Sequence, residues 1–190
     1  MAERQSSWML ARAVGQLRTL MAYDIDVPIG LVDAAIAELS KVIVTGGSSQ
    51  VTLAIRRTGE MEACRMSAEV LFRAWDQKNK GLLQGVPFRK WRQDMDHLKQ
   101  ATQRVMGKLV EAQDNLVAYS QCAFIFFEAC QVMSDEELEN TLPQLNQTEK
   151  ELVDAARECL VEAKAMLALC ILAARQTVRT MKDLMHLFSA

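Results

Sequence analysis

The sequence has few of the residues that interrupt helices. Only three prolines and eight glycines occur in 190 residues, and they fall between segments with helical periodicity. Strand patterns are weak. Half of the residues are apolar and 24% are charged, which is the composition of an ordinary folded protein and not of a disordered one. The sequence therefore predicts an all-α fold.

Residues that carry chemistry are also scarce. There are only two histidines, His97 and His186, and none of the five cysteines forms a Cys-x-x-Cys pair. The chain has no glycine-rich phosphate loop, no serine nucleophile elbow and no Glu-x-x-His pair. We therefore expect no enzyme activity, no metal site, no cofactor and no small-molecule substrate.

Long apolar runs and targeting signals are missing as well. The longest apolar run, residues 165–174, has ten residues, well short of the ~18 that a membrane-spanning helix needs. It predicts a buried or interface helix. The odd number of cysteines, without an N-terminal signal segment, indicates reduced thiols inside a cell.

Helical periodicity and turn signals together predict about eight helices in two packed subdomains, residues 1–82 and 86–190. Gly46 and Gly47, Gly59, Gly81 and Pro143 are expected to end helices. Ser6 or Ser7 is expected to cap the first helix, and Pro28 to begin the second. The segments are residues 6–22, 28–45, 48–58, 60–79, 88–133 (one helix, or two joined near Gly107), 134–142 and 146–187.

Residues 88–133 form the longest periodic segment. Apolar positions recur there at steps of three and four, as on one face of a helix; they are Val105, Leu109, Ala112, Leu116, Tyr119, Ala123, Phe127 and Cys130. Residues 122–127 are apolar on every side, which predicts a helix surrounded by others.

Charge is strongly segregated along the chain. Residues 73–108 contain nine bases and three acids, a net charge of +6, whereas residues 111–162 contain two bases and twelve acids, a net charge of −10. Residues 163–190 return to +3. This separation predicts a basic face for anionic partners and head-to-tail attraction between copies. The alternative is that both are solvated helix faces within one fold.

The most informative local feature is the block Phe-Arg-Lys-Trp-Arg at residues 88–92. Bases beside aromatic rings suit the headgroup layer of an anionic membrane, and equally the phosphates and bases of RNA. Alternatively the rings belong to the core and only the charges face water. The candidate anion-binding residues are Arg89, Lys90, Arg92, Arg73, Lys78, Lys80, Arg56 and Arg57.

Three segments resemble orthomyxovirus matrix proteins. Residues 88–92 look like the basic helix of that family, one base short because Gln93 follows. Residues 119–133 are similar to the helices that come next, without their paired Cys/His ligand set. Residues 173–182 (Ala-Ala-Arg-Gln-Thr-Val-Arg-Thr-Met-Lys) resemble the Ala-Arg-Gln-x-Val-x-x-Met helix near the end of the family. Size and divergence suit the isavirus branch.

The resemblance implies a two-subdomain helical protein that polymerises into a layer beneath the viral envelope. Such a protein would bind anionic membrane, contact the viral ribonucleoprotein and drive assembly and budding. It would occur in the virion, the host cytoplasm and nucleus, and at the inner face of the plasma membrane. The alternative is an intracellular helical adaptor that offers a methionine-rich groove to a partner helix, since eleven methionines suit an adaptable surface.

Overall fold

A computed structural model describes residues 2–39, 47–79 and 86–189. In these ranges the chain forms five α-helices and no strand: α1 (Ala2–Ala22), α2 (Asp26–Leu39), α3 (Gly47–Lys78), α4 (Val86–Cys130) and α5 (Asp135–Ser189). The predicted all-α class is therefore confirmed, but the predicted number of about eight helices is wrong.

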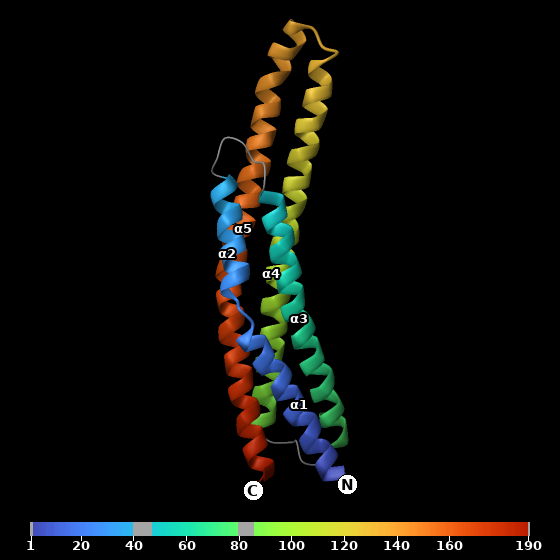
Figure 1. Ribbon diagram of the computed structural model, residues 1–190, viewed down its shortest axis with the longest axis vertical. Helices are drawn as coiled ribbons and strands as arrows, with labels where there is room; N and C mark the ends of the chain where they lie inside the picture. Colours follow the sequence, from blue (N-terminus) through green and yellow to red (C-terminus); the bar gives the residue numbers. More distant parts are fainter. Residues whose placement is uncertain (1, 40–46, 80–85, 190) are drawn as a thin grey trace.

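The helices form an elongated bundle built around the antiparallel pair of α4 and α5 (Figure 1). Helix α3 runs beside this pair from the level of α2 to the end that holds the termini, with α1 packed against it and α5 at that end and α2 packed against it and α5 further along. The start of α1, the end of α3, the start of α4 and the end of α5 all lie at the same end of the molecule. At the opposite end the last turns of α4 and the first turns of α5 project beyond the other helices as a hairpin.

The helix count was too high because three expected breaks are not breaks. Helix α3 continues through Gly59, α4 through Gly107 and α5 through Pro143. A glycine costs only about 1 kcal/mol in a helix interior, which tertiary packing overrides. Neither glycine is required by a close contact, since a Cβ atom at Gly59 or Gly107 would meet nothing within 4 Å. Pro143 is exposed, so water can satisfy the carbonyl group that its missing N–H leaves free.

Two predicted helix boundaries also need correction. Helix α1 already begins at Ala2, so Ser6 is a buried residue inside the helix and not its cap. Helix α2 begins at Asp26, two residues before the expected start at residue 28, and Pro28 lies in its first turn, as expected. The expected stops at Gly46 and Gly81 lie outside the described residues, as does most of the predicted junction between the two subdomains.

Ser134 and Glu137 form a capping box at the start of α5, as the three-residue spacing of Ser and Glu before a helix predicts. The backbone N–H of Ser134 donates to Glu137 Oε2 at 3.1 Å, and the N–H of Glu137 donates to Ser134 Oγ at 3.4 Å. This reciprocal pair satisfies backbone groups that a helix start leaves free. The capping box therefore fixes the start of α5 directly after Ser134.

The buried residues form one core cluster, to which all five helices contribute. On α4 the predicted stripe is correct from Val105 to Leu116, where the side chains are at most 2% exposed. Beyond Leu116 the prediction fails, because residues 117–155, all of them described, include no buried residue. In the described part of the chain no third helix covers the hairpin, and the segment expected to be surrounded by other helices, residues 122–127, is partly or fully exposed.

Candidate functional site

The end of the bundle that holds both termini carries a group of exposed bases, which we call the basic pole. It consists of Arg4, Arg73, Lys78, Arg89, Lys90, Arg92 and Lys182. Carboxylates share this end, namely Glu69, Asp76, Asp94, Asp96 and Asp183. The geometry of the individual bases therefore decides which of them can meet an anionic partner.

Arg89 and Lys90 are the bases that remain most available. They are consecutive residues in the first turns of α4, both are exposed, and none of the ion pairs between described residues involves them. Their neighbours Phe88 and Trp91 lie on the opposite side of the helix and are only 6% and 3% exposed. A helix turns by about 100° per residue. Arg89 and Lys90 therefore share the side that faces solvent, and Phe88 and Trp91 share the side that faces the core.

The aromatic rings of the block belong to the core. Phe88 stacks on Phe72 of α3 with ring centroids 5.7 Å apart, and Trp91 also stacks on Phe72. The indole N–H of Trp91 is buried without a hydrogen-bond partner among the described residues. Of the two interpretations left open by the sequence, the structure supports rings in the core and charges in water, so these rings do not reach a headgroup layer.

Three other bases of the pole, Arg92, Arg73 and Lys78, have partners within the fold. Arg92 donates to Asp76 Oδ2 at 2.7 Å, and its guanidinium lies 4.5 Å from the centre of the Phe88 ring. Arg73 pairs with Glu69. Lys78 Nζ donates to Gln5 Oε1 at 3.4 Å, which links the end of α3 to the start of α1. The two ion pairs reduce the charge that the pole can offer, whereas Lys78 keeps its charge because the Gln5 amide is neutral.

Arg56 and Arg57 lie elsewhere. Both form ion pairs with Glu60, at 3.7 and 3.1 Å, and Tyr23 in the turn after α1 also donates to Glu60. Hydrogen bonds from Tyr23 and Arg57 lower the pKa of the Glu60 carboxyl group. Arg57 and Arg73 are sixteen positions apart in the sequence, which corresponds to about 24 Å of helix. The structure therefore does not bring Arg56 and Arg57 together with the pole, and Lys80 lies outside the described residues.

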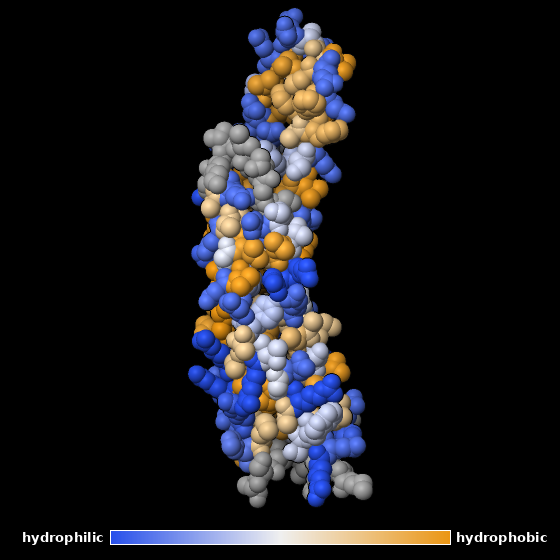
Figure 2. Space-filling view, in the orientation of Figure 1, coloured by the Kyte–Doolittle hydropathy of each residue, from blue (hydrophilic) through white to orange (hydrophobic). Residues whose placement is uncertain are grey.

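The hairpin is the counterpart of the basic pole. Residues 111–162 carry the net charge of −10, and the rest of the chain carries +8. Among the acids of the hairpin, Phe124, Ile125 and Phe127 are 62 to 64% exposed. Figure 2 shows apolar side chains gathered at this end of the molecule. Sequence reasoning missed this surface because helical periodicity cannot show that no neighbouring helix covers it.

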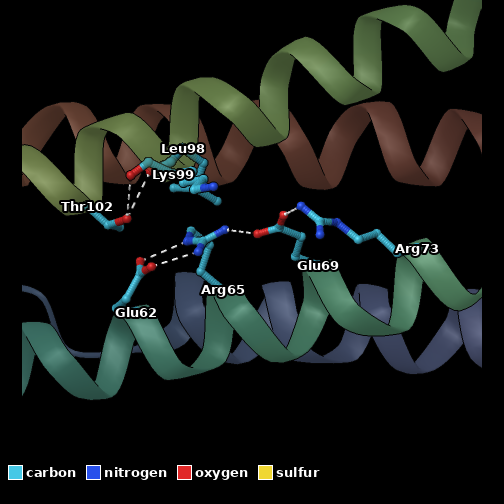
Figure 3. A network of polar contacts seen from close by, with 7 residues as sticks. All are labelled: Glu62, Arg65, Glu69, Arg73, Leu98, Lys99 and Thr102. Atoms are coloured by element: carbon cyan, nitrogen blue, oxygen red, sulfur yellow. Dashed lines mark hydrogen bonds and ion pairs between the residues drawn. The ribbon is translucent and has the colours of Figure 1, made fainter.

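A polar network along α3, on the side of that helix that faces α4, was also missed (Figure 3). Arg65 is only 3% exposed and donates to Glu62 at 2.7 and 2.8 Å and to Glu69 at 2.5 Å. Burial raises the pKa of Glu69, but the hydrogen bond and charge of Arg65 outweigh that effect, so the pKa is lowered overall. The sequence signal for this network is Arg65, an arginine that recurs at helical spacing with the core residues Met61, Ala68 and Phe72 of α3. The network is closed on itself and serves the fold.

Neither a metal centre nor a membrane span emerges from the described ranges. They contain no group of three or more His, Cys, Asp or Glu side chains placed to hold a metal ion. None of their helices is long and apolar enough to cross a membrane. Comparison of the chain with protein-family models, with curated proteins and with solved structures gives no match.

Proposed function

We propose that this chain is a non-enzymatic structural protein of the matrix type, which docks its basic pole on an anionic membrane. The observation that carries the proposal is the separation of charge along the bundle, with −10 on residues 111–162 and +8 on the remainder. A rod with this polarity is oriented by a negative surface, with its hairpin pointing away. The resemblance of residues 88–92 and 173–182 to matrix proteins supports the same assignment.

Arg89 and Lys90 are the principal docking residues in this proposal, with Arg4, Lys78 and Lys182 around them. Each base near an anionic leaflet contributes about 1 kcal/mol, so five bases give a weak, reversible and salt-sensitive attachment. The buried rings of Phe88 and Trp91 add no insertion. Assembly into a layer and contact with a ribonucleoprotein are further parts of the proposal that derive from the resemblance alone.

The test is sedimentation with vesicles of phosphatidylcholine, with and without phosphatidylserine. The variant Arg89→Glu with Lys90→Glu removes two attractions and adds two repulsions, so binding should weaken by about 2 to 4 kcal/mol. The matched control, Arg104→Glu with Arg157→Glu, changes the net charge equally at exposed positions away from the pole. Equal loss in both variants, or equal binding to neutral vesicles, would refute docking through the pole.

An adaptor role is the second candidate, and the exposed hairpin favours it over the expected methionine groove. Met61, Met95 and Met181 are buried in the core, whereas the hairpin presents Phe124 and Phe127 to solvent. Suppose that replacing Phe124 and Phe127 with serine abolishes vesicle binding while the variant Arg89→Glu with Lys90→Glu still binds. The vesicle is then contacted by the hairpin and not by the pole.

A further inference from the structure

The outward face of α5 carries an apolar stripe with no partner in the described structure. Leu169 and Leu172 are 58% and 59% exposed and Val161 is 52% exposed. The stripe lies opposite the side of α5 that faces the core, where Ala163, Leu167, Cys170 and Ala174 are buried. Its members recur at steps of three and four, and they are Val161, Ala165, Ala168, Leu169 and Leu172.

Charged residues continue the same face on both sides of the stripe. Lys150 and Asp154 precede it, and Arg179 and Asp183 follow it. All four are exposed, and none takes part in an ion pair between described residues. Glu158 is also exposed and lies on this face between Asp154 and Val161. Along the face the order is therefore base, two acids, apolar stripe, base, acid.

We infer that this face binds the same face of a second copy, with the two α5 helices antiparallel. The two-fold axis crosses α5 at the level between positions 166 and 167. This register is centred on the stripe. It places Asp154 opposite Arg179 of the other copy and Lys150 opposite Asp183, and the two-fold axis repeats both pairs. A parallel pairing would instead place each charge against its own kind, which is unfavourable.

The centre of the stripe suits a close helix-to-helix contact. Ala165 and Ala168 face each other across the axis, and their small side chains allow the two helices to approach. Val161 meets Leu172 on either side of them. Residues 150–183 span about 50 Å of helix, and a face about 10 Å wide covers roughly 500 Å² per copy, below the ~800 Å² of a standard stable interface. The dimer should therefore be reversible and depend on concentration.

The same register has a consequence for the basic pole, and this part of the inference rests on the proposed function. The end of one α5 lies beside residues near Gln144 of the other, so the hairpin of the partner extends about 15 Å past the pole. This acidic hairpin blocks approach of the pole to a flat membrane. Dimerisation and membrane docking then exclude each other, and the dimer is a soluble reserve of the docking monomer.

Sedimentation velocity over micromolar to millimolar protein tests the dimer without lipid. Leu169→Glu should raise the dissociation constant at least tenfold, whereas Val110→Glu, at an exposed valine of α4, should leave it unchanged. Asp154→Arg and Arg179→Asp should each weaken the dimer, and the double variant should restore it, because the swapped charges again oppose each other. A wild-type monomer at all concentrations, or a dimer insensitive to Leu169→Glu, overturns the inference, as does a double variant no better than the single ones.

Vesicle binding then separates the two proposals. Leu169→Glu should bind phosphatidylserine vesicles more tightly than the wild type at concentrations where the wild type is dimeric. If the dimer exists but Leu169→Glu binds vesicles no better, the competition is refuted and the dimer remains. If neither protein binds vesicles at any concentration, the docking function fails and the dimer stands by itself.

Discussion

The buried arginine of α3 allows a prediction whose size follows from the structure. Arg65 is 3% exposed and contacts two carboxylates, Glu62 and Glu69, whose side chains are each 19% exposed. Replacing Arg65 with methionine keeps much of the side-chain volume and removes the charge. Glu62 then stays largely buried without its counter-ion, and Glu69 keeps only the exposed Arg73.

Loss of one partner from a buried ion pair costs about 3 to 5 kcal/mol, mostly because the remaining charge is uncompensated. The partial exposure of Glu62 and Glu69 places Arg65→Met near the lower end, at about 3 kcal/mol. For a chain of this size that corresponds to a fall of roughly 6 to 12 °C in the melting temperature. Adding Glu62→Gln and Glu69→Gln should recover much of the loss, because neutral amides tolerate the site better.

Urea unfolding followed by circular dichroism measures the change in free energy of unfolding. The matched control is Arg73→Met, since Arg73 binds the same Glu69 but is 70% exposed, and an exposed ion pair contributes only about 0 to 1 kcal/mol. If Arg65→Met costs no more than Arg73→Met, burial does not decide the strength of these pairs and the reasoning fails.

Three further outcomes can be measured. The pKa of Glu69 is lower in the folded than in the unfolded protein, so the stability it contributes is present above the unfolded pKa and is lost as pH falls through the folded pKa. The wild type should therefore lose more stability on acidification than the Glu69→Gln variant. Equal acid sensitivity of the two proteins would contradict the pairing. Pro143→Ala should stabilise the hairpin by about 2 to 3 kcal/mol, seen as slower amide exchange in the first turns of α5 with little change in global unfolding, and unchanged exchange would count against a helix running through this position. Burial, and then the charge of Glu62, raise the pKa of the Cys170 thiol to about 12. At neutral pH a maleimide should therefore label the exposed Cys130 of the native protein and react with Cys170 only after unfolding. Rapid labelling of Cys170 in the native protein would disprove its packing.

Helical periodicity predicted the elements well where a neighbouring helix covers them. The stripe from Val105 to Leu116 is buried as expected, and Ala156, Ala163 and Cys170, which recur on one face of α5, are buried as well. The same periodicity continues to Phe127, which is exposed. A repeat of apolar residues shows which face of a helix is apolar, but whether another element covers that face depends on where the remaining helices end.

Breaks between helices were predicted less well, because a glycine or a proline affects a helix by only a few kcal/mol. Tertiary packing outweighs that cost at Gly59 and Gly107, and Pro143 lies in an exposed part of α5 where water can satisfy the free carbonyl group, so all three remain inside helices. The candidate site was likewise predicted only in part. Charge clustering found Arg89 and Lys90, but it could not show that Arg57 is bound to Glu60 or that Arg92 is bound to Asp76.

By itself the sequence determined the helical class, the apolar face of each long helix and the separation of acidic from basic segments, because these depend on local spacing and on composition. Only the tertiary structure decided which apolar faces are covered, which bases have carboxylate partners, and that the acidic segment projects as a hairpin away from the basic pole. Those outcomes depend on contacts between residues far apart in the chain, such as Arg92 with Asp76 and Thr180 with Asp94, which no local pattern encodes.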